Sequence, residues 1–181
     1  MKKPCISITV AMDDKVFSSF SSFDVFIMAG RGRMLLGFFV LMTTLALINF
    51  YTDAALLFWI LIIIGGFVPL SFLVRYRAST VQQINRFHLE EPKDVYCLDF
   101  FEADKSFALT ITDQPTQRIA YSSMHGAYRT KRAIYLYVKK TQAYIVPVAQ
   151  LGEERAKALL ALLEKKLPAD KLHAKPTILR A

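Results

Sequence analysis

The chain has 181 residues, room for about one domain of ordinary size, and 54% of them are hydrophobic, with a mean hydropathy of +0.31. Both values are high for a water-soluble protein, and the excess lies between Met34 and Val74. The formal net charge is +8, but the Lys and Arg residues are dispersed along the chain, which argues against a nucleic-acid-binding protein. Cys5 and Cys97 form no CxxC or Cys/His cluster, so no metal site is expected.

The segment Cys5–Met12 alternates between apolar and polar residues, which predicts a half-buried β-strand. The apolar positions are Ile6, Ile8 and Val10. A single strand is unstable, so we expect it to join a sheet formed elsewhere in the chain.

An amphipathic helix is predicted over residues 14–28, with Asp13 as its N-cap. Gly30–Arg33 are expected to break it before the apolar stretch begins. The sequence allows two placements for this helix: on the lipid surface or against a soluble domain.

The stretch from Met34 to Val74 predicts two membrane-spanning helices, over residues 34–51 and 54–74. The first would be about 27 Å long, just enough for the hydrocarbon core of a bilayer. Asp53 is the one formal charge in the stretch. A charge at the bilayer centre costs several kcal/mol, so we expect a hairpin that turns at Asp53 rather than a single long helix.

Arginines flank the predicted hairpin on one side only. Arg31 and Arg33 precede it and Arg75 and Arg77 follow it, while the turn contains no Lys or Arg. The positive-inside rule then predicts a multi-pass protein of the cytoplasmic (inner) membrane with both termini in the cytoplasm. The same four arginines are candidate contacts for anionic lipid headgroups, worth on the order of 1 kcal/mol each.

After the second span, residues 75–93 predict a short helical continuation and a linker. From Asp94 the pattern changes to closely spaced short strands, which is typical of an antiparallel meander. The strand segments are Asp94–Phe101, Lys105–Asp113, Gln117–Ser123, Met124–Thr130, Arg132–Val138 and Ala143–Val148. Pro147 lacks an N–H, so its strand is expected to lie at an edge or to end there.

An amphipathic helix over Glu153–Leu167 is predicted to close the fold, with acidic residues in its first turn and lysines in its last. A basic tail that follows it is expected to be flexible. The predicted organisation is therefore a strand and helix (1–33), a transmembrane hairpin (34–74), a juxtamembrane linker (75–93), a β domain with a C-terminal helix (94–168) and the tail (169–181).

Four short motifs in the second half of the chain resemble those of the YcxB-like family of bacterial membrane proteins. They are Ile119–Met124, Ala133–Tyr137, Ala143–Val148 and Gly152–Glu154. The order of elements is similar over nearly the whole chain, although Val148 stands where the family often has Lys or Arg. The resemblance implies an α+β membrane protein whose cytoplasmic domain is pleckstrin-homology-like (PH-like), a bent antiparallel sheet capped by the C-terminal helix. It implies no established biochemical role.

Motifs that would indicate an enzyme are missing from the sequence. His88, His125 and His173 are isolated from one another and lack metal-ligand spacing. There is no nucleophile elbow, P-loop or dinucleotide-binding glycine pattern. We therefore expect no enzymatic activity, no cofactor and no catalytic or metal-binding residues.

One basic cluster lies in the β segment. Arg129, Lys131 and Arg132 fall between two predicted strands, and Lys139 and Lys140 fall in the next turn. On a PH-like sheet the two loops would form a patch for phosphate headgroups. The alternative is that these charges only keep turns and edges soluble.

The sequence favours a membrane-tethered cytoplasmic binding or scaffold module. Its partners would be the lipid bilayer, with anionic lipid, another protein or a second copy of the chain as ligand, and no nucleic acid. The alternative function is a small oligomeric membrane subunit that assists transport or channel assembly. Such a subunit would associate through small residues such as Gly65–Gly66.

Overall fold

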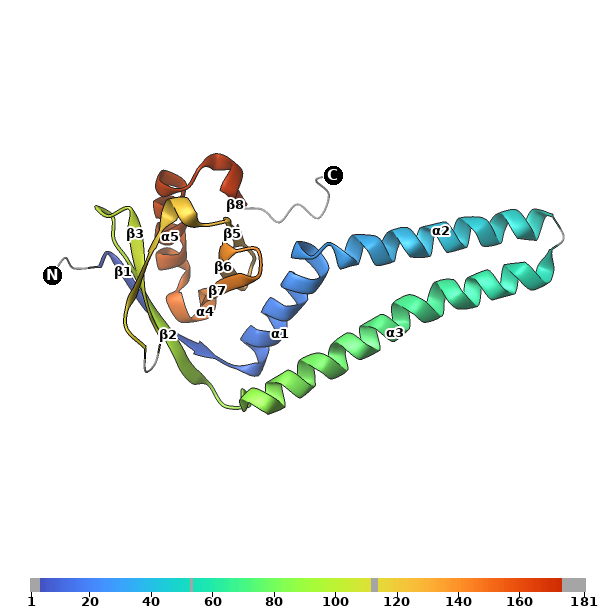
Figure 1. Ribbon diagram of the computed structural model, residues 1–181, viewed down its shortest axis with the longest axis horizontal. Coiled ribbons are helices and arrows are strands. Elements are labelled where there is room, and N and C mark those ends of the chain that lie inside the picture. Colours follow the sequence, from blue (N-terminus) through green and yellow to red (C-terminus); the bar gives the residue numbers. More distant parts are fainter. Residues whose placement is uncertain (1–3, 53, 112–113, 174–181) are drawn as a thin grey trace. The chain divides into compact units, whose positions relative to one another are not determined.

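The computed structural model describes residues 4–52, 54–111 and 114–173 (Figure 1). Asp53, where the hairpin was expected to turn, lies outside the described residues, as does the part of the expected tail from residue 174 onward. The chain divides into two compact units. The β unit comprises residues 1–16 and 91–181, and the helical unit comprises Phe17–Glu90.

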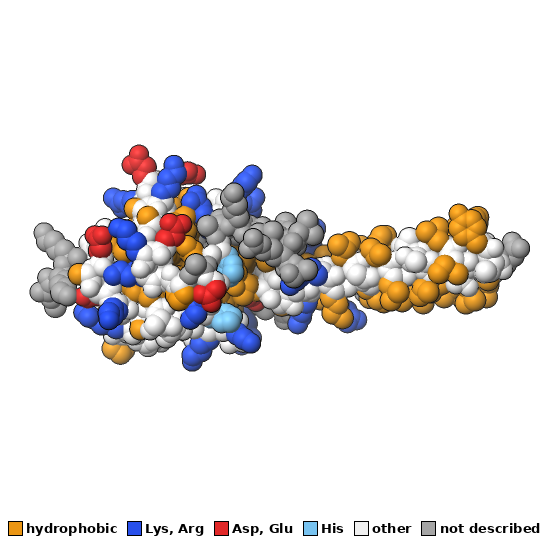
Figure 2. All heavy atoms as spheres, turned by 90° about the horizontal axis from the view of Figure 1, so that it is seen from above, with side chains coloured by type: hydrophobic (Ala, Val, Ile, Leu, Met, Phe, Trp, Pro, Cys, Tyr) orange, Lys and Arg blue, Asp and Glu red, His pale blue; other side chains and the backbone are white. Residues whose placement is uncertain are grey.

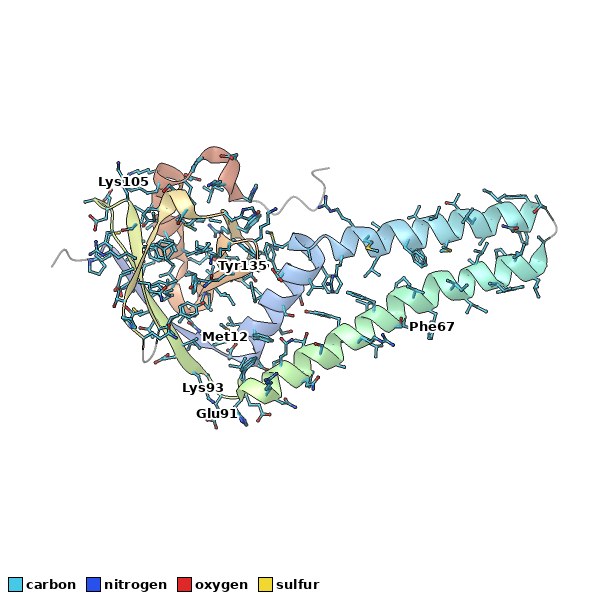
Figure 3. All side chains as sticks on the ribbon, in the orientation of Figure 1. Met12, Phe67, Glu91, Lys93, Lys105 and Tyr135 are labelled. Atoms are coloured by element: carbon cyan, nitrogen blue, oxygen red, sulfur yellow. The ribbon has the colours of Figure 1, made fainter. Side chains whose placement is uncertain are left out.

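The first sheet of the β unit contains the N-terminal strand. Its order is β1 (Ile6–Met12), β2 (Lys93–Phe100), β3 (Ser106–Ile111) and β4 (Gln117–Ala120), and all its pairs are antiparallel. The strand predicted at the N-terminus therefore joins the sheet formed after the hairpin. Met12 pairs with Lys93, and both are labelled in Figure 3. The helical unit is thus an insertion in the connection between two neighbouring strands.

The second sheet has the order β7 (Gln142–Pro147), β6 (Ala133–Lys139), β5 (Gly126–Arg129) and β8 (Leu172–His173). A 3-10 turn at Tyr121–Ser123 separates the two sheets, so the predicted meander is divided in two. Pro147 ends the edge strand β7, as expected. The expectation of a flexible tail from residue 169 is wrong for its first residues, because β8 pairs with β5 in parallel.

Two helices follow β7. The sequence did not predict α4 (Val148–Leu151), whereas α5 (Glu153–Lys166) lies within one residue of its predicted bounds. Gly152 separates them with a φ of +84°, a left-handed value that favours glycine over residues with a Cβ.

Both sheets and α5 contribute to one hydrophobic core. Among its fully buried side chains are Val10, Leu98, Leu109, Leu136, Leu159 and Leu163. Tyr96 joins the sheets inside this core. Its hydroxyl donates to the carbonyl oxygen of Ile145 at 2.9 Å and accepts from the N–H of the same residue at 2.7 Å. Burial raises the pKa of Tyr96 well above its usual value, and the hydroxyl stays protonated at neutral pH.

The helical segment begins as the sequence predicts. The N–H of Val16 donates to Asp13 Oδ1 at 2.7 Å, which confirms the N-cap of α1 (Asp14–Phe23). The π-helix η1 (Asp24–Met28) completes the predicted helix. The helices are interrupted at Ala29 and at Gly30, which has a φ of +67°, and α2 begins at Arg31. The expected break at Gly30–Arg33 is therefore shorter than predicted.

Helices α2 (Arg31–Tyr51) and α3 (Ala55–Phe87) form an antiparallel hairpin (Figure 1). Helix α3 continues unbroken through Pro69, and its end lies roughly 20 Å beyond Val74. The helices are closely packed at Gly65, where an added Cβ would lie 2.9 Å from Met42 Cβ. Small residues permit this approach in membrane helix pairs.

Both helices are long and apolar enough to cross a membrane, and only 6% of the apolar window of each is buried. They therefore differ from the core helices of a soluble protein. Figure 2 shows hydrophobic side chains along the hairpin. Phe67, labelled in Figure 3, is 67% exposed. An apolar surface of this extent marks an interaction site with lipid or protein.

Candidate functional site

Four of the arginines that the sequence singled out lie at one end of the hairpin. Arg31 and Arg33 occupy the first turn of α2, and Arg75 and Arg77 follow the apolar part of α3. Because the helices run antiparallel around Met42 and Gly65, the start of α2 is level with this part of α3. All four side chains are exposed. We call them the arginine cluster.

An aromatic group supports the arginine cluster. The ring of Phe26 in η1 contacts Tyr76 and Phe72 of α3 edge-to-face, with centroids 5.0 and 6.2 Å apart. The guanidinium carbon of Arg31 lies 6.0 Å from the Phe72 ring centroid, a cation–π arrangement. The hydroxyls of Ser22 and Tyr76 are 2.9 Å apart. These contacts pack η1 and the end of α1 against α3.

Gly32 makes the junction between η1 and α2 possible. A Cβ at this position would lie 2.9 Å from the backbone oxygen of Phe26, so a larger residue would push η1 away from α2. Gly30 supplies the left-handed turn just before it. The glycines predicted a break, but the sequence alone did not reveal that they bring Arg31 to an aromatic group.

The other three candidates, Arg129, Lys131 and Arg132, lie at the turn between β5 and β6 in the β unit. Thr130 organises this turn, because its hydroxyl donates to the carbonyl oxygen of Ala133 at 3.0 Å and accepts from the N–H of Ala133 at 3.1 Å. Lys131 and Arg132 are exposed and Arg129 is half-buried. We call this segment the basic turn.

The predicted patch that joined the basic turn to Lys139 and Lys140 is wrong. The basic turn precedes β6 and the two lysines end it or follow it, so the strand separates them by roughly 20 Å. The sequence predicted that both loops belong to one sheet. Because β6 runs from one loop to the other, the two loops lie at opposite ends of that sheet.

The basic turn lies at the end of the β unit where β1 ends. The carbonyl oxygen of Arg132 accepts a hydrogen bond from the N–H of Val148 at 2.9 Å, at the start of α4. The Gln150 side chain of α4 then donates to the carbonyl oxygen of Ala11 at 2.7 Å and accepts from its N–H at 3.0 Å. Gln150 thereby pairs the N–H and C=O groups of Ala11 on the outer edge of β1. No pattern in the sequence predicts this role. Val148 itself is buried, so it makes no charged contact.

Within the described ranges no group of three or more His, Cys, Asp and Glu side chains is arranged to hold a metal ion. In the β unit, burial raises the pKa of Tyr121 to about 12 and also raises the pKa of Tyr128. Among the described residues, the basic side chains that the sequence singled out form two separate groups, the arginine cluster in the helical unit and the basic turn in the β unit.

A comparison with family models matches residues 108–163 to the family described as YcxB-like protein. The match extends from β3 into α5 and includes all four motifs on which the resemblance was based. The resemblance is confirmed over these residues. No curated protein and no solved structure gives a significant match.

Proposed function

We propose that the protein is a membrane-anchored binding module of the cytoplasmic membrane. Helices α2 and α3 cross the bilayer as a hairpin, and the β unit is a cytoplasmic PH-like domain. The apolar surface of the hairpin supports the anchor, because so little of it is buried by the protein itself. Two four-stranded sheets, antiparallel except for the β5–β8 pair, and a C-terminal helix over a shared core support the PH-like fold.

The arginine cluster is the observation that carries the proposal. It puts four cations at one end of an otherwise apolar hairpin, while residues 52–54 at the other end include no Lys or Arg. Under the positive-inside rule this end faces the cytoplasm, and both termini lie there. The cations at this depth bind anionic headgroups, and α3 carries the chain on into the cytoplasm beyond them.

The anchor contributes to binding because it confines the β unit to the bilayer surface. A ligand in or near the same membrane meets the β unit at a raised effective concentration, so modest intrinsic affinity suffices. The basic turn would contribute to the same preference for anionic partners.

Thiol labelling tests the orientation directly. Cys5 is exposed in the β unit and reports where that unit resides. In intact spheroplasts a membrane-impermeant maleimide is expected to leave Cys5 unlabelled, and permeabilisation should make it react. Labelling of intact spheroplasts would contradict the proposal.

Lipid contact is tested by replacing all four residues of the arginine cluster with Gln in the full chain in nanodiscs. Binding of a fluorescent anionic lipid should weaken at least tenfold, since each charge is worth on the order of 1 kcal/mol. The matched control replaces Lys139 and Lys140 with Gln, which should change binding little. Equal losses in both variants would show that the arginine cluster has no special role.

The structure also bears on the alternative of an oligomeric membrane subunit. Gly65 is occupied by the Met42 contact inside one hairpin, whereas a Cβ at Gly37 or Gly66 would meet nothing within 4 Å. Cysteine crosslinking between copies at position 66 in membranes would favour this second function, and crosslinking confined to the β unit would favour the first.

A further inference from the structure

The chain returns to the second sheet after α5. Residues Ala169–Lys171 form a 3-10 turn, and β8 then runs along β5 with Leu172 opposite Ala127 and His173 opposite Tyr128. This is the one parallel pair among the described strands. A two-residue strand at a sheet edge is short for a structural element.

Three successive side chains hold this segment in place. Lys171 Nζ donates to the carbonyl oxygens of Met124 at 2.9 Å and Ser122 at 3.3 Å. Leu172 packs, partly buried, against the hydrophobic core. The imidazole of His173 stacks on the Tyr128 ring, with centroids 4.5 Å apart and planes inclined by 21°. Main-chain pairing with one specific contact per side chain is how an added peptide strand is recognised.

The edge of β5 is shaped for close approach of a backbone. A Cβ on Gly126 would lie 3.2 Å from the carbonyl oxygen of Lys171 and 3.2 Å from Tyr128 Cε2. Any larger residue at this position would therefore press on the segment that lies there. Gly126 lies within a strand and has no positive φ, so its backbone conformation does not require glycine. The absence of a Cβ instead makes room for the backbone of Lys171.

We propose that the β5 edge is a binding site for an extended peptide with the pattern Lys–aliphatic–His or aromatic. The chain's own segment Lys171–His173 occupies it in the resting protein. The proposal rests on the function proposed above, since it gives the binding module its class of ligand. The partner adds a strand beside β5, and its Lys reaches the carbonyl oxygens that Lys171 now contacts.

A short tether favours the resting occupant over a free peptide with the same contacts. Only Leu167–Asp170 separate α5 from the segment, and a short tether gives an effective concentration in the millimolar range. The segment supplies Leu172 alone to the core, at its periphery. It can therefore leave while the two sheets and α5 remain packed.

The test measures binding of a fluorescein-labelled, blocked peptide Ala-Asp-Lys-Leu-His, the sequence of residues 169–173, to the protein in detergent. A variant that ends at Pro168 should bind it, and the full chain should bind it at least tenfold more weakly because the tethered segment competes. A peptide with Glu for Lys and Ser for His should not bind. In the shortened chain, Gly126→Val should abolish binding, whereas Ser122→Ala should preserve it, since the contact uses the backbone oxygen.

Failure of the shortened chain to bind the peptide, with its cooperative unfolding retained, would overturn the proposal. If that chain does not fold, full-length Lys171→Glu/His173→Ser serves instead. It should show faster hydrogen exchange at Ala127 and Tyr128 and a gain of peptide binding, and unchanged exchange without a gain would equally overturn the proposal. Failure of the membrane anchor would appear separately, as extraction of the wild-type chain by alkaline carbonate.

Discussion

At the scale of single residues, Tyr96 shows how one side chain fixes the relation of two sheets. Its hydroxyl satisfies both backbone groups of Ile145, a residue on the other sheet, in a buried position. The alternation of β2 puts Tyr96, Leu98 and Phe100 on one buried face. The partner of the hydroxyl depends on the packing of two sheets, and no local pattern reveals it.

Replacing Tyr96 with Phe should destabilise the β unit by about 1–3 kcal/mol, because the N–H and C=O of Ile145 lose their buried partner. Denaturant unfolding of the full chain in detergent, followed by near-ultraviolet circular dichroism, measures this loss. Tyr144→Phe is the matched control, since the Tyr144 hydroxyl accepts a hydrogen bond from the side-chain amide of the exposed residue Gln142 rather than from a buried backbone group. An equal effect of the two substitutions would contradict the assigned role.

The Tyr96 substitution also has a pH signature. The folded-state pKa of Tyr96 is raised, so its contribution is fully present below the unfolded pKa of about 10 and is lost as pH rises above it. The wild-type chain should therefore lose more stability than Tyr96→Phe between neutral pH and the alkaline range.

At the level of helices and strands, the close packing of α2 against α3 depends on which small residue lies at their contact. The sequence offers Gly65 and Gly66 equally, and a helix turns by about 100° per residue, so only one of them can face α2. The structure places Gly65 against Met42 and leaves open space at Gly66. That choice follows from the rotation of α3 about its axis, which hydropathy alone does not specify.

Gly65→Ala should separate the helices and destabilise the hairpin by roughly 1–3 kcal/mol, because its Cβ meets Met42 Cβ rather than a flexible side-chain end. Gly66→Ala brings the same gain in helix propensity without a contact, so it should be neutral or stabilising. Thermal unfolding of the helices in the two full-length variants, measured in the same detergent, compares their midpoints. Matching midpoints would rule out the Gly65 contact as a source of stability.

At the scale of the whole molecule, the helical unit is an insertion between two paired strands. Met12 and Lys93 are partners in the β1–β2 ladder, so the points where the chain leaves and re-enters the β unit are adjacent. A fragment that starts at residue 88 would lack β1 and its three buried side chains, and it should fail to fold.

Replacing residues 13–92 with a four-residue turn containing Asn-Gly should instead produce a soluble, folded β unit, because it closes β1 and β2 into an ordinary hairpin. Cooperative thermal unfolding in buffer without detergent is the expected result. Adding Ile8→Asp should abolish folding, whereas Thr9→Asp on the exposed face of β1 should be tolerated. An unfolded product with the intact core would show that the β unit depends on the helical unit.

The features with a local signal could be read from the sequence: the apolar length of the hairpin, the one-sided arginines, the N-cap at Asp13, the alternation of β1 and the amphipathic face of α5. These depend on composition and period within one segment. Four features become visible only in the folded chain. Strand β1 closes a sheet with strands from the other side of the hairpin, and residues 172–173 pair with β5. Lys139 and Lys140 lie away from the basic turn, and the guanidinium of Arg31 lies over the Phe72 ring. Each of these depends on contacts between residues distant in the chain, where strand direction and helix rotation fix which side chains meet.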